Sequence, residues 1–270
     1  APFMLAVAIA MFTYTMRKAQ PKITFSVALA VIIVSIILAM FAPGWLGSDA
    51  ETTVSEYITR GTIAWISLPM LLVTIAPMAN EVVTQIQRKS KTSVLKRIPV
   101  GAHVVHLGLI LLMVGHIFTT TLVNRGDASH RVSLVQDEIT IHGDYGFEFL
   151  EIILKDDGLE VGDGYVGIRI AVYEFTENAD GTADFTQIAI VEPGMLRFDS
   201  TGTARSEVDT LSRWHGDIVF IFDGSQANGL MQQATTDGLD SIEMVRVTIY
   251  DLQNSHLVWS GWSLMLIGMA

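Results

Sequence analysis

Long apolar segments alternate with short polar links over the first 123 residues. Crossing the hydrocarbon core of a bilayer takes about 20 mostly apolar residues. Four segments reach or approach that length: residues 1–16, 23–43, 62–79 and 99–123. A fifth apolar segment, 255–270, stops at the last residue. From this abrupt end we expect the native protein to continue, and we expect this chain to be part of a larger membrane protein.

Between residues 124 and 254 the pattern changes to short runs in which apolar and polar residues alternate. Such alternation predicts strands. We expect strands over 132–135, 138–142, 147–154, 165–175, 186–191, 217–222 and 243–250, separated by turns at 156–158, 163–164, 178–181, 192–194 and 223–224. Strands at this spacing predict a small all-β sandwich or barrel domain. The predicted fold class is therefore an α-helical membrane bundle of about five spans, with an all-β domain inserted before the last one.

The charges predict how the chain is oriented in the membrane. The links after the first and third spans hold eight of the 17 Lys and Arg residues, whereas the link at 44–61 carries Asp49, Glu51 and Glu56 against Arg60. Since basic loops face the cytoplasm, we expect a multi-pass protein of the cell membrane with residues 124–254 on the extracytoplasmic side. The aromatic pair Trp259 and Trp262 suits the start of the last span at a headgroup interface.

Composition excludes several classes of protein. Residues 124–254 contain 24 acidic and eight basic side chains, a net charge of −16, which repels nucleic acid and other anionic partners. This acidic segment also suits a halophilic archaeal source. Cysteine is absent, so the chain has no disulfide and no CxxCH haem-attachment motif, and it is not itself a c-type cytochrome.

Three histidines lie in the predicted span 99–123: His103, His106 and His116. An ionisable residue at membrane depth is a functional hypothesis by default, and imidazole is a common axial ligand of haem iron. His103 and His106 lie near one helix face, while His116 points roughly 80° away from His106 and sits near the outer end. Gly108, beside His106, would let a planar group or a second helix approach closely.

A plainer interpretation competes with ligation, namely neutral histidines that are hydrogen-bonded across helices or exposed at the interface. We favour it for His103, hold the two interpretations equal for His116, and find that depth alone does not decide for His106. Arg125 and Arg131, just beyond the span, could pair with haem propionates, although we favour anchoring at the headgroups for both. The histidines of the acidic segment are expected to be solvated: His130, His142 and His215.

The order of several motifs resembles the C-terminal part of the CcmF family, the integral-membrane haem lyase component of cytochrome c maturation. His106-Leu107-Gly108-Leu109 matches a membrane motif of that family. The other matching segments, in chain order, are Tyr145–Phe149, Glu192–Phe198, Ser206–Glu207, Asp217–Val219 and Val258–Gly261.

This resemblance implies a function. His106 would be one of two intramembrane ligands to a haem b, with His116, Gly108 and Arg125 as further candidate contacts. The second ligand would come from a missing segment or another chain, because in the family it lies on an earlier span. The lyase would add two thiols of apocytochrome c across the two vinyl groups of a substrate haem. The family's tryptophan-rich substrate-haem motif is not in this sequence.

The resemblance also implies partners. These are a haem-delivery chaperone, an apocytochrome-binding subunit, the missing N-terminal CcmF-like part, apocytochrome c, quinol and membrane lipid. Two alternatives stay open. A membrane cytochrome b or quinol-linked redox subunit would be expected to carry histidine pairs on several helices, whereas among the four spans of residues 1–123 only one has histidines. A cofactor-free membrane anchor presenting a β domain would need no ligand at all.

Overall fold

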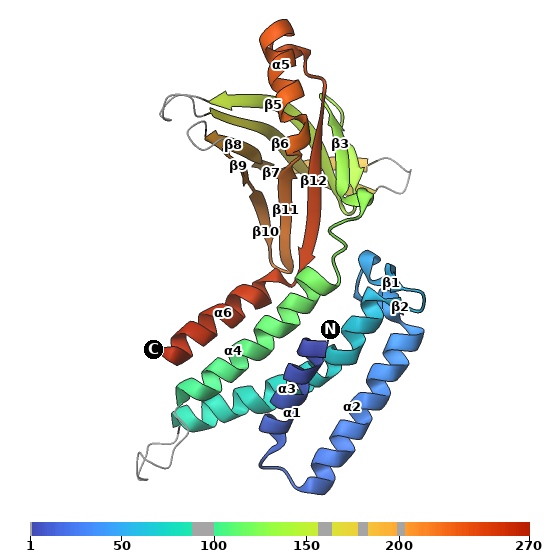
Figure 1. Ribbon diagram of the computed structural model, residues 1–270, viewed down its shortest axis with the longest axis vertical. Coiled ribbons are helices and arrows are strands. Elements are labelled where there is room, and N and C mark those ends of the chain that lie inside the picture. The colour runs from blue at the N-terminus through green and yellow to red at the C-terminus, as the bar shows by residue number, and fades with distance from the viewer. Residues whose placement is uncertain (1, 88–99, 156–163, 178–182, 199–202) are drawn as a thin grey trace. The chain divides into compact units, whose positions relative to one another are not determined.

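The computed structural model describes residues 2–87, 100–155, 164–177, 183–198 and 203–270 (Figure 1). Two compact units make up the chain: residues 1–124 together with 252–270, and residues 125–251. The basic residues of the predicted cytoplasmic link, 88–97, lie outside the described residues. So do the predicted turns at 156–158 and 178–181 and the first residue of the turn at 163–164.

Helices form the first unit. They are α1 (Pro2–Met16), α2 (Pro21–Phe41), α3 (Arg60–Gln87), α4 (Val100–His116) and α6 (Ser255–Met269). The π-helical η4 (Ile117–Thr121) extends α4. Between α2 and α3 lie the short helices η1 (Pro43–Leu46) and η2 (Ser48–Glu51) and a two-stranded sheet of β1 (Thr53–Ser55) and β2 (Ile58–Thr59). Each apolar segment predicted from the sequence is therefore helical.

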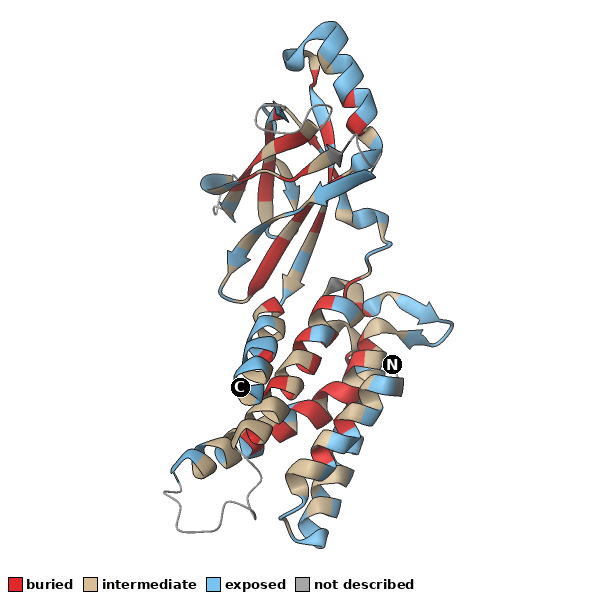
Figure 2. Cartoon of the chain, turned by 60° about the vertical axis from the view of Figure 1, so that its left-hand side comes forward, coloured by how far each residue is buried: buried red, intermediate tan, exposed pale blue. Residues whose placement is uncertain are grey.

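The apolar surface of these helices indicates a membrane protein. Within the described residues, three helical stretches are long and apolar enough to cross a bilayer: Pro21–Phe41, Arg60–Gln87 and Val100–Thr121. Phe3–Met16 is a shorter apolar helix. On α2, Ile32, Ile33 and Ile36 are all exposed, and Figure 2 shows long exposed stretches on the helices. Lipid stabilises such a surface and water does not. A multi-pass membrane protein is thus supported, while the count of five spans and the sidedness stay predictions.

Helix α3 packs against α1, α2 and α4, and α6 packs along α4. Leu71 and Met78 of α3 and Ile110 of α4 are almost fully buried where these helices meet. This packing fixes one face of α4 against α3 and α1 and another against α6.

The second unit is built mainly of strands. They are β3 (Arg131–Val135), β4 (Thr140–His142), β5 (Tyr145–Lys155), β6 (Gly164–Glu177), β7 (Ala183–Val191), β8 (Gly194–Phe198), β9 (Thr203–Glu207), β10 (Asp209–Arg213), β11 (Gly216–Phe222) and β12 (Met244–Gln253). One sheet has the order β10-β11-β12-β3. The other has the order β4-β5-β6-β8-β9, with β7 also paired to β6. The short helices are η5 (Ala128–His130), η6 (Gly224–Gln226), α5 (Ala227–Asp237) and η7 (Leu239–Ser241).

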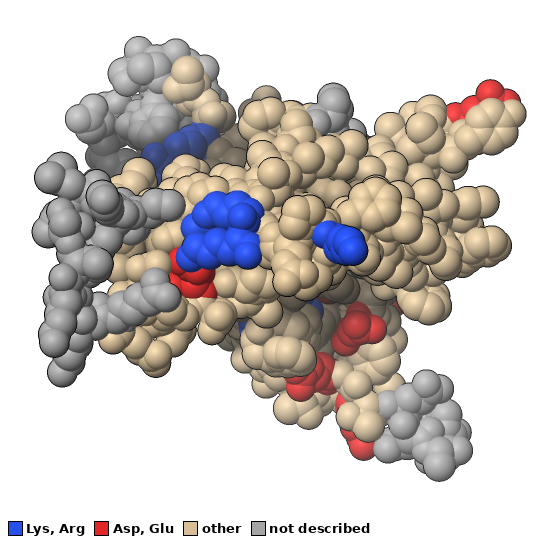
Figure 3. All heavy atoms as spheres, turned by 90° about the horizontal axis from the view of Figure 1, so that it is seen from below, with Lys and Arg blue, Asp and Glu red and all other residues tan. Residues whose placement is uncertain are grey.

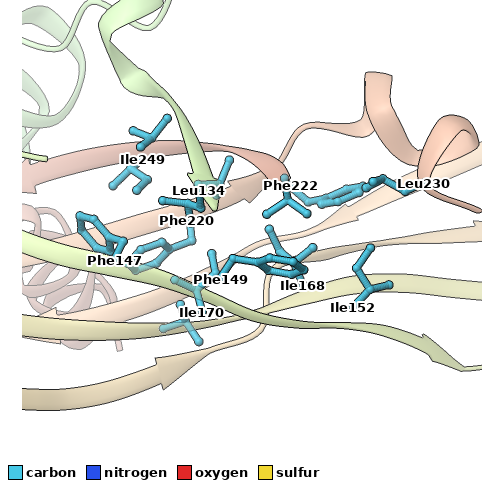
Figure 4. Packing of buried hydrophobic residues seen from close by; sticks show 14 of the residues in the cluster. Leu134, Phe147, Phe149, Ile152, Ile168, Ile170, Phe220, Phe222, Leu230 and Ile249 are labelled. Carbon is cyan, nitrogen blue, oxygen red and sulfur yellow. The ribbon is translucent and has the colours of Figure 1, made fainter. Parts of the chain in front are cut away.

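Both sheets contribute to one apolar core. Phe147 and Phe149 of β5 meet Phe220 of β11 there, with the rings of Phe147 and Phe220 edge to face at 5.7 Å (Figure 4). Two facing sheets around one core form a sandwich. The seven predicted strands are present. The unit is not all-β, however, because it contains the helix α5, which the sequence analysis did not predict. Its only buried residues are Ala227 and Leu230, too few for a clear helical period.

Candidate functional site

Helix α4 carries the predicted histidines and approaches α6 through glycine. Gly101, Gly108 and Gly115 all lie against α6. A Cβ at Gly108 would stand 2.7 Å from the carbonyl oxygen of Gly261 and 2.8 Å from the backbone nitrogen of Met265. Only a residue without a side chain fits so close to another backbone. The sequence allowed either a planar group or a second helix to approach Gly108. In the structure it is a second helix, α6, that lies there.

The ring of His106 lies on the other side of α4. It precedes Gly108 by two residues, about 200° around the helix. Tyr14 of α1 stacks on the His106 ring, with centroids 4.3 Å apart and planes inclined by 7°. Nδ1 of His106 contacts the carbonyl oxygen of Ala102. Because a carbonyl only accepts, Nδ1 would be the donor in this contact, and a neutral ring that donates from Nδ1 keeps its lone pair on Nε2. That is the tautomer in which Nε2 can ligate a metal.

His103 is engaged from both of its ring nitrogens. It is buried, with 1% of its surface exposed. Its Nδ1 lies 3.3 Å from the hydroxyl oxygen of Tyr14, and its Nε2 lies 3.8 Å from Oε1 of Glu81 on α3. His103 therefore joins α4 to two other helices, as the plainer interpretation of this residue expected.

Glu81 continues these contacts toward the end of the helices. Its Oε1 accepts from Nζ of Lys18 at 2.6 Å and from Nε2 of Gln85 at 2.8 Å. The side chain of Lys18 is 59% exposed and that of Glu81 is 19% exposed. The face seen from below is mostly uncharged, with isolated basic and acidic groups (Figure 3). A polar chain thus runs from exposed Lys18 through Glu81, His103 and Tyr14 to His106. An imidazole between two oxygen groups can accept a proton on one side and release one on the other.

The other two predicted contacts lie apart from this chain. His116 is exposed, and its Nδ1 lies 3.4 Å from the hydroxyl oxygen of Thr120. Arg125 belongs to the second unit, where its side chain is exposed and its backbone carbonyl accepts from the hydroxyl of Tyr250 at 3.0 Å. The structure therefore joins His106 with His103, and does not join His106 with His116.

Arg60 was missed as a candidate, although it ties down the end of the histidine helix. Its Nη1 donates to the carbonyl oxygens of Thr121 at 3.1 Å and Val123 at 3.2 Å, and its Nη2 donates to Oδ1 of Asn124 at 2.9 Å. A guanidinium suits the carbonyls that a helix leaves unpaired at its C-terminus. Asp49 accepts from the backbone nitrogen of Asn124 at 2.7 Å. The sequence feature that could have pointed to Arg60 is that it is a single arginine in the otherwise acidic link at 44–61.

The histidines of the second unit are more enclosed than expected. The ring of His130 lies 4.9 Å from that of Tyr250, and the ring of His215 lies 5.0 Å from that of Trp214. Burial lowers the pKa of His142, and the charge of His130 lowers it further. Within the described ranges, no three His, Cys, Asp or Glu side chains gather into a metal site.

The helix bundle and the β unit together fit a multi-pass membrane protein with a β domain. Among solved structures, the chain is similar to the cytochrome c haem lyase CcmF, with 16% sequence identity and a TM-score of 0.52. The match covers 89% of this chain and 33% of the CcmF chain, so this chain spans about a third of that protein. The CcmF-like fold expected from the motifs is confirmed at this level. No protein-family pattern and no curated protein matches the chain.

Proposed function

We propose that this chain is part of a membrane haem lyase for c-type cytochromes, with His106 as an axial ligand of a haem b. The CcmF-like fold supports the class of protein. The hydrogen bond between His106 and Ala102 supports the ligand, because it leaves Nε2 available for iron. The hydrogen bond between His106 and Ala102 is the single observation that supports His106, rather than another residue, as the ligand.

The residues around His106 fit such a role better than those around the other histidines. Tyr14 fixes the plane of the His106 ring by stacking, and Ala102 fixes its tautomer. His103 is hydrogen-bonded to Tyr14 through Nδ1 and faces Glu81 with Nε2, and Gly108 is covered by α6. A haem held at His106 would supply an iron able to take up and release one electron. We place the second axial ligand of this haem on another segment or another chain. His116 and Arg125 stay further candidate contacts of the haem.

The polar chain beside His106 would influence the protonation and hydrogen bonding of the His106 ring. Tyr14 contacts both histidine rings, and Glu81 links His103 to exposed Lys18. Proton movement along these groups would leave Nδ1 of His106 protonated and hydrogen-bonded to Ala102. The protein's part in the reaction is then to bind, orient and polarise, while the cofactor supplies the redox chemistry.

In this proposal residues 125–251 face the extracytoplasmic side, where thiols of apocytochrome c add across the vinyl groups of the substrate haem. Each S–H bond adds across one C=C bond, so the addition itself consumes no oxidant. Holding both reactants in one orientation is the main contribution expected of the enzyme. The partners would be the N-terminal CcmF-like part, a haem-delivery chaperone, an apocytochrome-binding subunit and quinol.

The ligand assignment is tested by haem content. The chain is co-expressed and purified in mild detergent with the N-terminal CcmF-like part, which would bring the second ligand, and haem per complex is measured from the Soret band and the pyridine haemochrome. We expect His106→Ala to lose most of the haem, and the matched variant His116→Ala to keep more than half of it. Equal haem in wild type and His106→Ala would overturn the assignment, and so would a wild-type complex without haem.

The lyase function needs a separate measurement. The chain is expressed with the N-terminal CcmF-like part and with an apocytochrome that bears a CxxCH motif, and covalent haem on the product is measured. We expect product with wild type and at least a tenfold loss with His106→Ala, at unchanged amounts of the chain in the membrane. A chain that holds haem yet yields no product would be a plain membrane cytochrome b.

A further inference from the structure

The hairpin between β10 and β11 ends in a tryptophan that the fold leaves in the open. Arg213 and Gly216 are partners across the two strands, so Trp214 and His215 form a two-residue turn. The side chain of Trp214 is 91% exposed, and its ring meets His215 edge to face at 5.0 Å. Tryptophan combines a large apolar ring with one N–H donor. Water solvates such a ring poorly, so we expect a less polar environment around the Trp214 ring in the functional protein.

This turn is fixed beside the end of β12. The guanidinium of Arg213 pairs with the carboxylate of Asp251 and donates to the hydroxyl oxygen of Tyr145 at 3.4 Å. Asp251 lies near the end of β12, and α6 begins at Ser255. Four residues of extended chain span at most about 14 Å. That is the greatest distance by which the chain can separate Asp251 from the first residue of α6.

Both connections to the helical unit leave the β unit at this edge. The first connection is at Arg125, whose carbonyl accepts from the hydroxyl of Tyr250 at 3.0 Å. The second follows Asp251, the next residue after Tyr250. In the helical unit these connections lead to α4 and α6, which pack along one another. Helix α4, with η4, is long and apolar enough to cross a bilayer, so the two chain connections of this edge run to a candidate membrane span and to the helix packed along it.

The charges around the turn suit a lipid surface better than those of the unit as a whole. The segment 124–254 has 24 acidic and eight basic residues. At the turn, however, Asp217 is buried and accepts from the hydroxyl of Ser212 at 2.7 Å, while Asp251 is paired with Arg213. What the turn itself exposes is the indole of Trp214, while the imidazole of His215 is half-buried against it and the side chain of Asp251 is 45% exposed. Tryptophan is enriched where membrane proteins meet lipid headgroups.

We propose that the Trp214–His215 turn inserts into the headgroup region of the bilayer and holds this edge of the β unit on the membrane surface. The anchor does not depend on haem. Its effect would be to restrict the tilt of the β unit, because a third contact adds to the two chain connections.

Fluorescence in lipid nanodiscs tests this anchor. The full chain is placed in phosphatidylcholine discs with plain or brominated acyl chains, and the Trp214 component is the difference between wild type and Trp214→Phe. We expect this component to emit at shorter wavelength than exposed tryptophan in water, and to lose at least half of its intensity in brominated lipid. Circular dichroism and gel filtration check that Trp214→Phe folds as wild type does.

A matched control uses the opposite end of β12. Leu239 is 47% exposed in η7, just before β12 begins. A ten-residue strand such as β12 is about 33 Å long. Leu239→Trp in the Trp214→Phe background is expected to show solvent-like emission and less than a tenth of quenching. A solvent-like, unquenched Trp214 overturns the proposal, as does equal quenching at both ends. A shift that appears only on adding apocytochrome c would assign the turn to a protein partner and also overturn it.

Discussion

Replacing Gly108 tests one of the close backbone contacts between α4 and α6. A Cβ there would lie 2.7 Å from the carbonyl oxygen of Gly261, whereas ordinary contact begins at 3.4 Å. In Gly108→Ala the two backbones must therefore separate by about 0.7 Å, a gap that forfeits a quarter to a half of the attraction of each atom pair. Summed over the interface, we expect destabilisation of about 1–3 kcal/mol, the usual cost of overpacking.

Hydrogen exchange of the chain in detergent measures this change locally. The amide protection of α6 and the facing turns of α4 should fall by roughly 5- to 150-fold, since about 1.4 kcal/mol is a factor of ten in the opening equilibrium. The matched control is Gly229→Ala in α5, where nothing lies within 4 Å of the added Cβ. That change should stabilise α5 by about 0.8 kcal/mol through helix propensity. Protection of α6 unchanged within twofold in Gly108→Ala would refute the close approach.

Two further predictions concern other parts of the fold. Arg60→Gln leaves the carbonyls of Thr121 and Val123 without their charged donor; we expect a loss of about 2 kcal/mol, measured as faster exchange in η4, and unchanged exchange there would contradict the clamp. Burial raises the pKa of Tyr165 to about 12, with nearby carboxylates, Glu192 foremost, adding to the shift. The folded pKa lies above the ordinary value near 10, so this stabilisation is full below pH 10 and is lost as pH rises through 12. A 295 nm titration should lose its latest-titrating tyrosine in Tyr165→Phe, and an unchanged titration would disprove the shift.

The helices could be predicted from the sequence because a run of apolar residues long enough to span lipid is a strong signal. Their ends could not. The predicted span 62–79 became α3, Arg60–Gln87, because its polar last turns are held by contacts with other helices. Glu81 binds Lys18, and these two residues lie far apart in the sequence.

The missed strands lack an apolar pattern. β9, Thr203–Glu207, is largely exposed and pairs with β8 through its backbone. Backbone pairing of this kind produces no alternation of apolar and polar side chains along the strand, so the sequence pattern does not reveal it. The motif Tyr145–Phe149 shows the opposite case, since Phe147 and Phe149 alternate into the core of the sandwich.

At the candidate site the sequence singled out His106 by its depth in an apolar run, by the neighbouring Gly108 and by the resemblance of its motif to CcmF. It could not identify the residues that set the state of that ring. Tyr14 comes from a different helix, and the contact of Nδ1 with Ala102 depends on the rotamer of His106. Nor could spacing alone show that α6 covers Gly108. These are tertiary contacts, and a single sequence does not encode them as a local pattern.

The central claim is that Nε2 of His106 binds haem iron, and imidazole rescue of His106→Gly tests it most directly. Resonance Raman spectra of the haem-loaded chain, purified together with the N-terminal CcmF-like part that would bring the second ligand, are compared without and with added imidazole. We predict a six-coordinate, low-spin wild type, a variant that has lost haem or become five-coordinate and high-spin, and a return to the wild-type spectrum on adding imidazole. A variant that is already six-coordinate and low-spin without imidazole would contradict the claim.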